Sequence, residues 1–278
     1  MIARALAAAL ALAAALALPA RAERPAQMAV EAAVSDAVPG HPGLTYAALL
    51  KLALPDLAEG EDGIWTGTPA GPLRTPDGQP GVAETLTFRS VETLEILSDG
   101  RPIRLVMTNE MQDGVFTTLL AAYDLEGASP ALLDAVDAGL DRWTALATTL
   151  PLAEGMDAVI VNGSHVNAGE NYEVSSVLLL RKGRFAAICT QLAYSAMTGD
   201  WQSVESFAVA AEPDPGAPYS AVAVSVTVET TRLCLDCAIE EGAPAPGRRV
   251  YSGRFRWDAA AEAYAPAGGD LAEVPGPE

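Results

Sequence analysis

The stretch from Asn162 to Tyr172 holds the densest group of side chains in this sequence that could do chemistry. It reads Asn-Gly-Ser-His-Val-Asn-Ala-Gly-Glu-Asn-Tyr and lies between the apolar run Ala158 to Val161 and a predicted strand that begins at Val174. We expect it to form a loop held by a rigid sheet, where binding groups are often found. The candidate ligand-binding residues are Asn162, Ser164, His165, Asn167, Glu170, Asn171 and Tyr172.

Two kinds of chemistry fit this stretch. Its amides and hydroxyls can bind a sugar or a peptide backbone, and His165 can act as a base. Ser164 and His165 do not make a nucleophile–base pair, because adjacent residues of an extended chain point to opposite faces and the context is not G-x-S-x-G. Catalysis by His165 would need a distant carboxylate, in a pocket rather than at a hairpin tip. A plain turn is the alternative, since asparagine and glycine are ordinary turn residues.

The three cysteines are Cys189, Cys234 and Cys237, and the last two have C-x-x-C spacing. A thioredoxin-like site would need a helix after the pair, but the segment from Ala238 to Gly247 contains two prolines and two glycines. A zinc site would need further ligands. We therefore predict a Cys234–Cys237 disulfide in a turn and a buried free thiol at Cys189. A long-range bridge from Cys189 to one of the pair is the alternative.

Two groups of charged residues have simpler interpretations than a binding site. The acidic group lacks the alternating ligands and central glycine of a calcium loop, so we expect a solvated helix face. We expect the basic group to form a charged outer strand face that limits edge association, with an anion or acidic-partner site as the alternative. The two groups are Asp134, Asp137 and Asp141, and Arg248, Arg249, Arg254 and Arg256.

Other catalytic and cofactor motifs do not occur in the sequence. It has no H-E-x-x-H, no phosphate loop and no dinucleotide fingerprint. The sequence has only two histidines, and His41 lies in a Pro-Gly-His-Pro-Gly turn. We therefore predict no cofactor and no metal site.

From Val82 onward the sequence alternates with period two, which predicts strands. Ser98-Asp99-Gly100-Arg101-Pro102 and Arg181-Lys182-Gly183-Arg184 are hairpin turns between such runs. In Ala221 to Thr231 the valines share one face, and in Arg248 to Trp257 the aromatics do. The pattern predicts a mainly β fold of antiparallel sheets built from hairpins, as a sandwich or an open-barrel or propeller-like sheet. An α+β fold is the alternative.

The helical content is expected to be small. Leu44 to Leu54 predicts a short helix capped by Thr45, followed by a glycine- and proline-rich loop over 60–81 that docks through Trp65. Ser129 to Leu150 fits either a helix or a strand that pairs back on Thr117 to Leu125. The expected organisation is a loosely ordered segment over 23–81, one β-rich domain over 82–266 and a flexible tail over 267–278.

The first 22 residues have the features of a cleavable secretory signal peptide. Arg4 supplies a positive charge, Ala5 to Leu18 contains only alanine and leucine, and Ala-Arg-Ala ends at Ala22. No later segment is long and apolar enough to predict a membrane span. We therefore expect a periplasmic or secreted protein in a compartment that permits disulfides.

Removal of this signal makes the chain more acidic. The remaining 256 residues contain 15 basic and 36 acidic side chains, a net charge of −21. Such a charge repels phosphate backbones and disfavours nucleic-acid binding. It is compatible with calcium or a cationic partner, although solubility is the simpler explanation. Because the chain has no catalytic constellation, we expect a non-catalytic binding or accessory module with an envelope or extracellular partner. The alternative is an exported hydrolase that uses His165.

Overall fold

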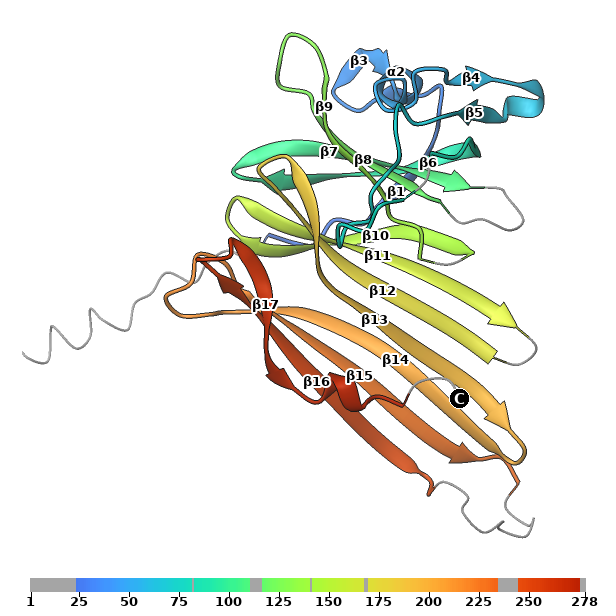
Figure 1. Cartoon of the computed structure of the whole chain (residues 1–278), viewed down its shortest axis with the longest axis vertical. Helices are drawn as coiled ribbons and strands as arrows, with labels where there is room; N and C mark the ends of the chain where they lie inside the picture. The colour runs from blue at the N-terminus through green and yellow to red at the C-terminus, as the bar shows by residue number, and fades with distance from the viewer. Residues whose placement is uncertain are drawn as a thin grey trace, which may run out of the picture.

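The computed structural model describes residues 24–81, 83–110, 117–140, 142–167, 170–234 and 245–275. Two antiparallel sheets of seven and eight strands dominate it (Figure 1). The seven-stranded sheet contains β1 (Val30–Ala33), β4 (Ala58–Glu59), β5 (Trp65–Gly67), β6 (Leu86–Ser98), β7 (Arg101–Glu110), β8 (Leu119–Asp124) and β9 (Ala131–Asp137). The eight-stranded sheet contains β10 (Trp143–Ala153), β11 (Met156–Asn167), β12 (Glu170–Arg181), β13 (Arg184–Thr198), β14 (Trp201–Glu212), β15 (Ala221–Arg232), β16 (Gly247–Asp258) and β17 (Ala263–Gly269).

The prediction of a mainly β fold built from antiparallel hairpins is confirmed. The strands of the eight-stranded sheet follow one another in chain order, and the sheet does not close into a barrel. Both predicted hairpin turns have positive φ at their two central residues, as a two-residue type I′ turn requires. These φ values are 50° and 79° at Asp99 and Gly100, and 51° and 69° at Lys182 and Gly183.

The strand interpretation of Ser129 to Leu150 is right and the helix interpretation is wrong. The segment forms β9 and most of β10, and β8 pairs with β9 from Leu119↔Asp137 to Asp124↔Ala131. Cross-strand pairing and burial on the sheet therefore override the local helical spacing. Within the described residues, no helix is both long and apolar enough to cross a membrane.

The expected solvated helix face of aspartates is wrong for the same reason. Asp134 lies on β9, where its carboxylate pairs with Arg74 at 2.5 Å and accepts a hydrogen bond from the Phe185 backbone N–H at 2.7 Å. Asp137 accepts hydrogen bonds from the backbone N–H groups of Thr118 and Gly139. These carboxylates bind loops and neighbouring strands to β9. The third aspartate lies outside the described residues.

Strands β10 to β13 form the middle layer of the molecule, between the seven-stranded sheet and strands β14 to β17 (Figure 1). Leu178 and Leu180 of β12 belong to one buried cluster with residues of the seven-stranded sheet such as Leu105. Leu179 belongs to a second cluster with Val224 of β15. Because both faces of β12 are buried from Val177 to Leu180, its sequence there is a continuous apolar run and does not alternate.

The segment over 24–81, expected to be loosely ordered, forms defined structure. It contains β2 (Ala37–Val38), β3 (His41–Thr45), α2 (Tyr46–Leu50) and η1 (Glu61–Gly63), in addition to β1, β4 and β5. Thr45 caps α2 as predicted, because its hydroxyl accepts a hydrogen bond from the Ala48 N–H at 3.2 Å, but the helix is shorter than expected. Trp65 packs against the core that α2 covers. The last element of the described chain is η2 (Leu271–Glu273).

The N-terminal strand joins the two sheets. Ala29 donates a backbone hydrogen bond to Ala147 of β10 at 3.0 Å, and the next residues, as β1, pair with β6. Arg24 forms an ion pair with Asp157 of β11, which is fully buried and also accepts a hydrogen bond from the Leu97 N–H of β6 at 2.7 Å. The ion pair therefore ties the start of the described chain to both sheets.

Replacement of Arg24 should destabilise the whole fold, because the buried Asp157 carboxylate would lose its counter-charge. We expect Arg24→Ala to lower the free energy of unfolding at pH 7 by about 2–3 kcal/mol in urea denaturation. The control is Arg249→Ala, which breaks a pair with Glu273 whose side chains are 62% and 65% exposed and should cost less than about 1 kcal/mol. Equal losses in the two variants would contradict the structural role of Arg24.

Candidate functional site

One end of the eight-stranded sheet carries most of the residues singled out from the sequence. The last residues of β11, β13 and β15 and the first residues of β10, β12, β14 and β16 all lie there, on the right-hand side of Figure 1, because neighbouring strands are antiparallel. We call it the distal end. The expected loop over Asn162 to Tyr172 is wrong for the described residues: Asn162 to Asn167 end β11, and Glu170 to Tyr172 begin β12. Since side chains alternate along a strand, the candidates divide between two faces.

A row of three rings lies on one face of the distal end. The register pairs His165 of β11 with Tyr172 of β12, and Tyr172 with Tyr194 of β13. The ring centroids of His165 and Tyr172 are 6.0 Å apart, and those of Tyr172 and Tyr194 are 4.9 Å apart. We call these three residues the aromatic row. Tyr194 was missed from the sequence because only the strand register brings it beside Tyr172.

Glu170 joins the two tyrosines. Its Oε2 accepts a hydrogen bond from the Tyr172 hydroxyl and its Oε1 accepts one from the Tyr194 hydroxyl, both at 2.9 Å. These hydrogen bonds to the carboxylate raise the pKa of both phenols, that of Tyr194 to about 12, because a phenolate would lose the bond and face a like charge. Both tyrosines therefore stay protonated as donors at neutral pH.

A second carboxylate binds the backbone of Tyr194. Glu205 of β14 is only 7% exposed, and its Oε2 accepts a hydrogen bond from the Tyr194 backbone N–H at 2.9 Å. The Glu205 N–H in turn donates to the Ser195 hydroxyl at 3.1 Å. Regular pairing between β13 and β14 covers only Ala196 to Thr198, so these bonds connect the two strands where the ladder has ended. Burial raises the pKa of Glu205.

The opposite face of the distal end carries three exposed apolar side chains among polar ones. Trp143, Val166 and Met197 are 58%, 61% and 60% exposed, and the pairing of β10 through β13 places all three on this face. The remaining candidates on the same face are Asn162, Ser164 and Asn171. The Asn167 backbone pairs with Glu170, and its side chain lies outside the described residues.

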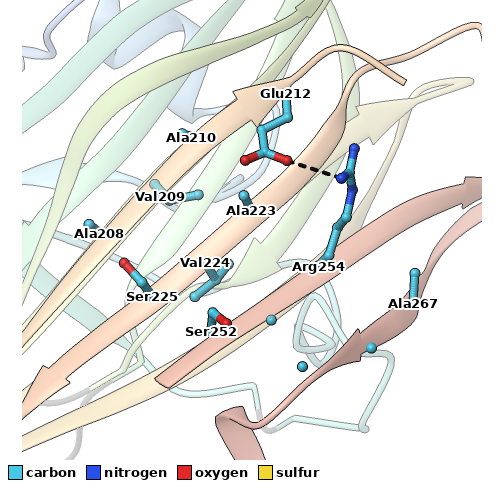
Figure 2. A pocket seen from close by; sticks show the side chains of 13 residues that line it. Ala208, Val209, Ala210, Glu212, Ala223, Val224, Ser225, Ser252, Arg254 and Ala267 are labelled. Carbon is cyan, nitrogen blue, oxygen red and sulfur yellow. Dashed lines mark ion pairs between the residues drawn. The ribbon is translucent and has the colours of Figure 1, made fainter. Parts of the chain in front are cut away.

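The hollow in Figure 2, of about 590 Å³, lies elsewhere, over β14 to β17. Small side chains form its floor, and the Glu212–Arg254 ion pair, with an N–O distance of 3.2 Å, borders it. Arg249 pairs with Glu273 at 3.1 Å, and Arg256 makes two hydrogen bonds to Asp214 at 2.7 and 2.8 Å. Acids of the same chain therefore neutralise three of the four clustered arginines, although Arg249 lies on the opposite strand face from the other three.

The surroundings of Cys189 do not suit a reactive thiol. Cys189 is a free, partly buried thiol, as predicted, and this excludes the long-range bridge. Its burial raises its pKa to about 12, so the thiol stays protonated and unreactive at neutral pH. The predicted Cys234–Cys237 bridge involves Cys237, which lies outside the described residues. No group of three or more His, Cys, Asp or Glu suited to a metal occurs in the described part of the chain.

Comparison with known proteins found no matching protein-family model, no similar curated protein and no similar solved structure. The chemistry of the distal end therefore carries the functional argument.

Removal of the Glu170 carboxylate should be visible in the tyrosine titration. We expect Glu170→Gln to lower the pKa of Tyr194 from about 12 toward its ordinary value of 10.0, because the charged acceptor is lost. Ring-labelled tyrosine NMR against pH measures this, with Tyr194→Phe to assign the resonance. The control is Glu173→Gln, which removes the exposed carboxylate next to Tyr172 in the chain. This variant should leave the pKa of Tyr194 unchanged. An unshifted Tyr194 in Glu170→Gln would contradict the hydrogen bond.

Burial of Glu205 should make stability depend on pH. Its folded-state pKa lies above the ordinary value of 4.5, so the folded state holds the proton longer than the unfolded state. The wild type should therefore lose stability relative to Glu205→Gln as the pH rises from below 4.5 through the raised pKa. Urea denaturation across this range measures the difference. Parallel curves for wild type and Glu205→Gln would refute it.

Proposed function

We propose that this chain is a non-catalytic binding or accessory module of the cell envelope. In this proposal it is exported by the signal in residues 1–22, works in the periplasm or outside the cell, and contacts an envelope or extracellular partner through the distal end. The observation that carries the proposal is that the candidate residues lie on both faces of paired strands at the tip of a sheet. A substrate pocket would instead gather them around one cavity.

The apolar face of the distal end supports a partner protein. Trp143, Val166 and Met197 keep more than half of their surface in water, although burial of a side chain of this kind is worth about 1.5–3 kcal/mol. Exposed apolar side chains on one face at the end of a sheet can form an interaction surface, and tryptophan is enriched among the residues that dominate binding energy. These three residues are therefore the proposed anchor.

The aromatic row supports binding more than catalysis. A histidine base is commonly oriented by a carboxylate that accepts its ring N–H, whereas the hydrogen bonds to Glu170 come from the hydroxyls of Tyr172 and Tyr194. Rings held in this way are preorganised for contact, because their side chains lose little entropy on binding. The alternative function, a hydrolase based on His165, would need another carboxylate.

Disruption of the apolar face should remove the partner. We expect Trp143→Ala and Met197→Glu to lower recovery of partners that co-purify with the mature protein at least about tenfold, since each removes an anchor of about 1.4 kcal/mol or more. Leu52→Glu is the control, because Leu52 is also exposed, at 42%, but lies far from the distal end in the chain. Equal losses in all three variants would count against the proposed surface.

Substitution of His165 separates the two functions. We expect a folded His165→Ala variant to keep every hydrolytic activity measured for the wild type on ester, peptide and glycoside substrates. Loss of one such activity, with unchanged stability, would favour the hydrolase.

A further inference from the structure

We propose that the aromatic row and Glu170 form a receptor for a cationic side chain, arginine or lysine, presented by the partner protein. The inference rests on the proposed function and names the chemistry that the site would recognise. The cation would lie against the Glu170 carboxylate and beside the rings of Tyr172 and Tyr194.

The Glu170 carboxylate is positioned but not neutralised. Each of its oxygens accepts one tyrosine hydrogen bond, whereas an ionised carboxylate can accept about four in total. Of the ion pairs between described residues, none involves Glu170. Acceptor capacity and negative charge are therefore both left for an external donor.

The tyrosine rings add to the attraction for a cation. An ammonium or guanidinium group near an aromatic face is attracted by the ring quadrupole by about 0.5–1 kcal/mol at exposed sites. The rings of Tyr172 and Tyr194 are 4.9 Å apart and inclined by 45°, and both direct their hydroxyls to the same carboxylate. One cation can therefore interact with the carboxylate and with a ring at the same time.

The charge of the chain favours the same ligand class. The mature protein carries a net charge of −21, which attracts cations over several ångströms and repels anions. A neutral sugar would gain nothing from this field. The exposed Trp143, Val166 and Met197 on the opposite face provide further contact area for a polypeptide, which a small free cation would leave unused.

Two glutamates of β12, Glu170 and Glu173, make a matched test possible. Glu170 and Glu173 each contribute one negative charge, and their substitution by glutamine changes the net charge equally. The side chains lie on opposite faces of the strand, because their positions differ by three residues. Only Glu170 is held by the tyrosines.

The experiment is a titration of the full mature protein with a hexa-arginine peptide at about 0.15 M salt, followed by tyrosine ring NMR and calorimetry. We expect the Tyr172 and Tyr194 resonances to shift, Glu170→Gln to weaken binding at least tenfold, and Glu173→Gln to weaken it less than twofold. Tyr194→Leu should weaken binding about two- to fivefold, as expected for loss of one cation–π contact.

Three results would overturn the inference. Equal weakening by the two glutamine variants would indicate non-specific charge attraction. Movement of the same resonances by a chitin oligosaccharide, but not by hexa-arginine, would indicate a neutral sugar site. Binding to phosphatidylcholine vesicles that is lost in Glu170→Gln would assign the cation to a lipid headgroup.

Two combinations of results distinguish the cation receptor at Glu170 from the partner surface at Trp143. If Trp143→Ala loses the co-purified partner while Glu170→Gln retains it and hexa-arginine does not bind, the binding module stands and the cation receptor does not. If hexa-arginine binds as expected but no partner depends on Trp143, the receptor stands and the proposed partner surface does not.

Discussion

Burial of both faces of strands β10 to β13 is the constraint on which the rest of the structure depends. Leu178 and Leu180 face the seven-stranded sheet, and Leu179 faces β14 to β17. A layer that is apolar on both sides must be covered on both sides, since each leucine contributes about 1.5–3 kcal/mol when removed from water. The N-terminal segment, which bonds to β10 through Gln27 and Ala29 and pairs with β6 through β1, then holds the covering sheet in place.

The covering layers bury only part of the length of strands β10 to β13. The part that stays uncovered is the distal end. The apolar run of β12 lies near its C-terminal end, from Val177 to Leu180. The seven residues before this run are Glu-Asn-Tyr-Glu-Val-Ser-Ser. Polar and aromatic side chains there do not require a covering layer, so the aromatic row is partly open and Trp143, Val166 and Met197 are exposed. The proposed partner surface thus lies on the same strand whose other part forms the core.

Two carboxylates with different surroundings shape the site. Glu170 is partly exposed and binds two hydroxyls, which leaves its charge available to an external cation. Glu205 is buried and supports the backbone of Tyr194, at an electrostatic cost that raises its pKa. A charge can take part in recognition only where a partner can reach it. The position of Glu170 therefore suits recognition, whereas that of Glu205 suits a structural role.

The sequence by itself determined the antiparallel hairpins, the Thr45 cap and the split of valines and aromatics between strand faces, because these follow from local turn chemistry and period-two alternation. The sequence also singled out the Asn162 to Tyr172 stretch as a candidate site, but it did not predict the strands within it. Only the tertiary structure decided that Ser129 to Leu150 is strand, that this stretch lies on two paired strands, and that Tyr194 and Glu205 belong to the site. The physical reason is that strand register and packing between layers join residues far apart in the chain, and local propensity contains no information about either.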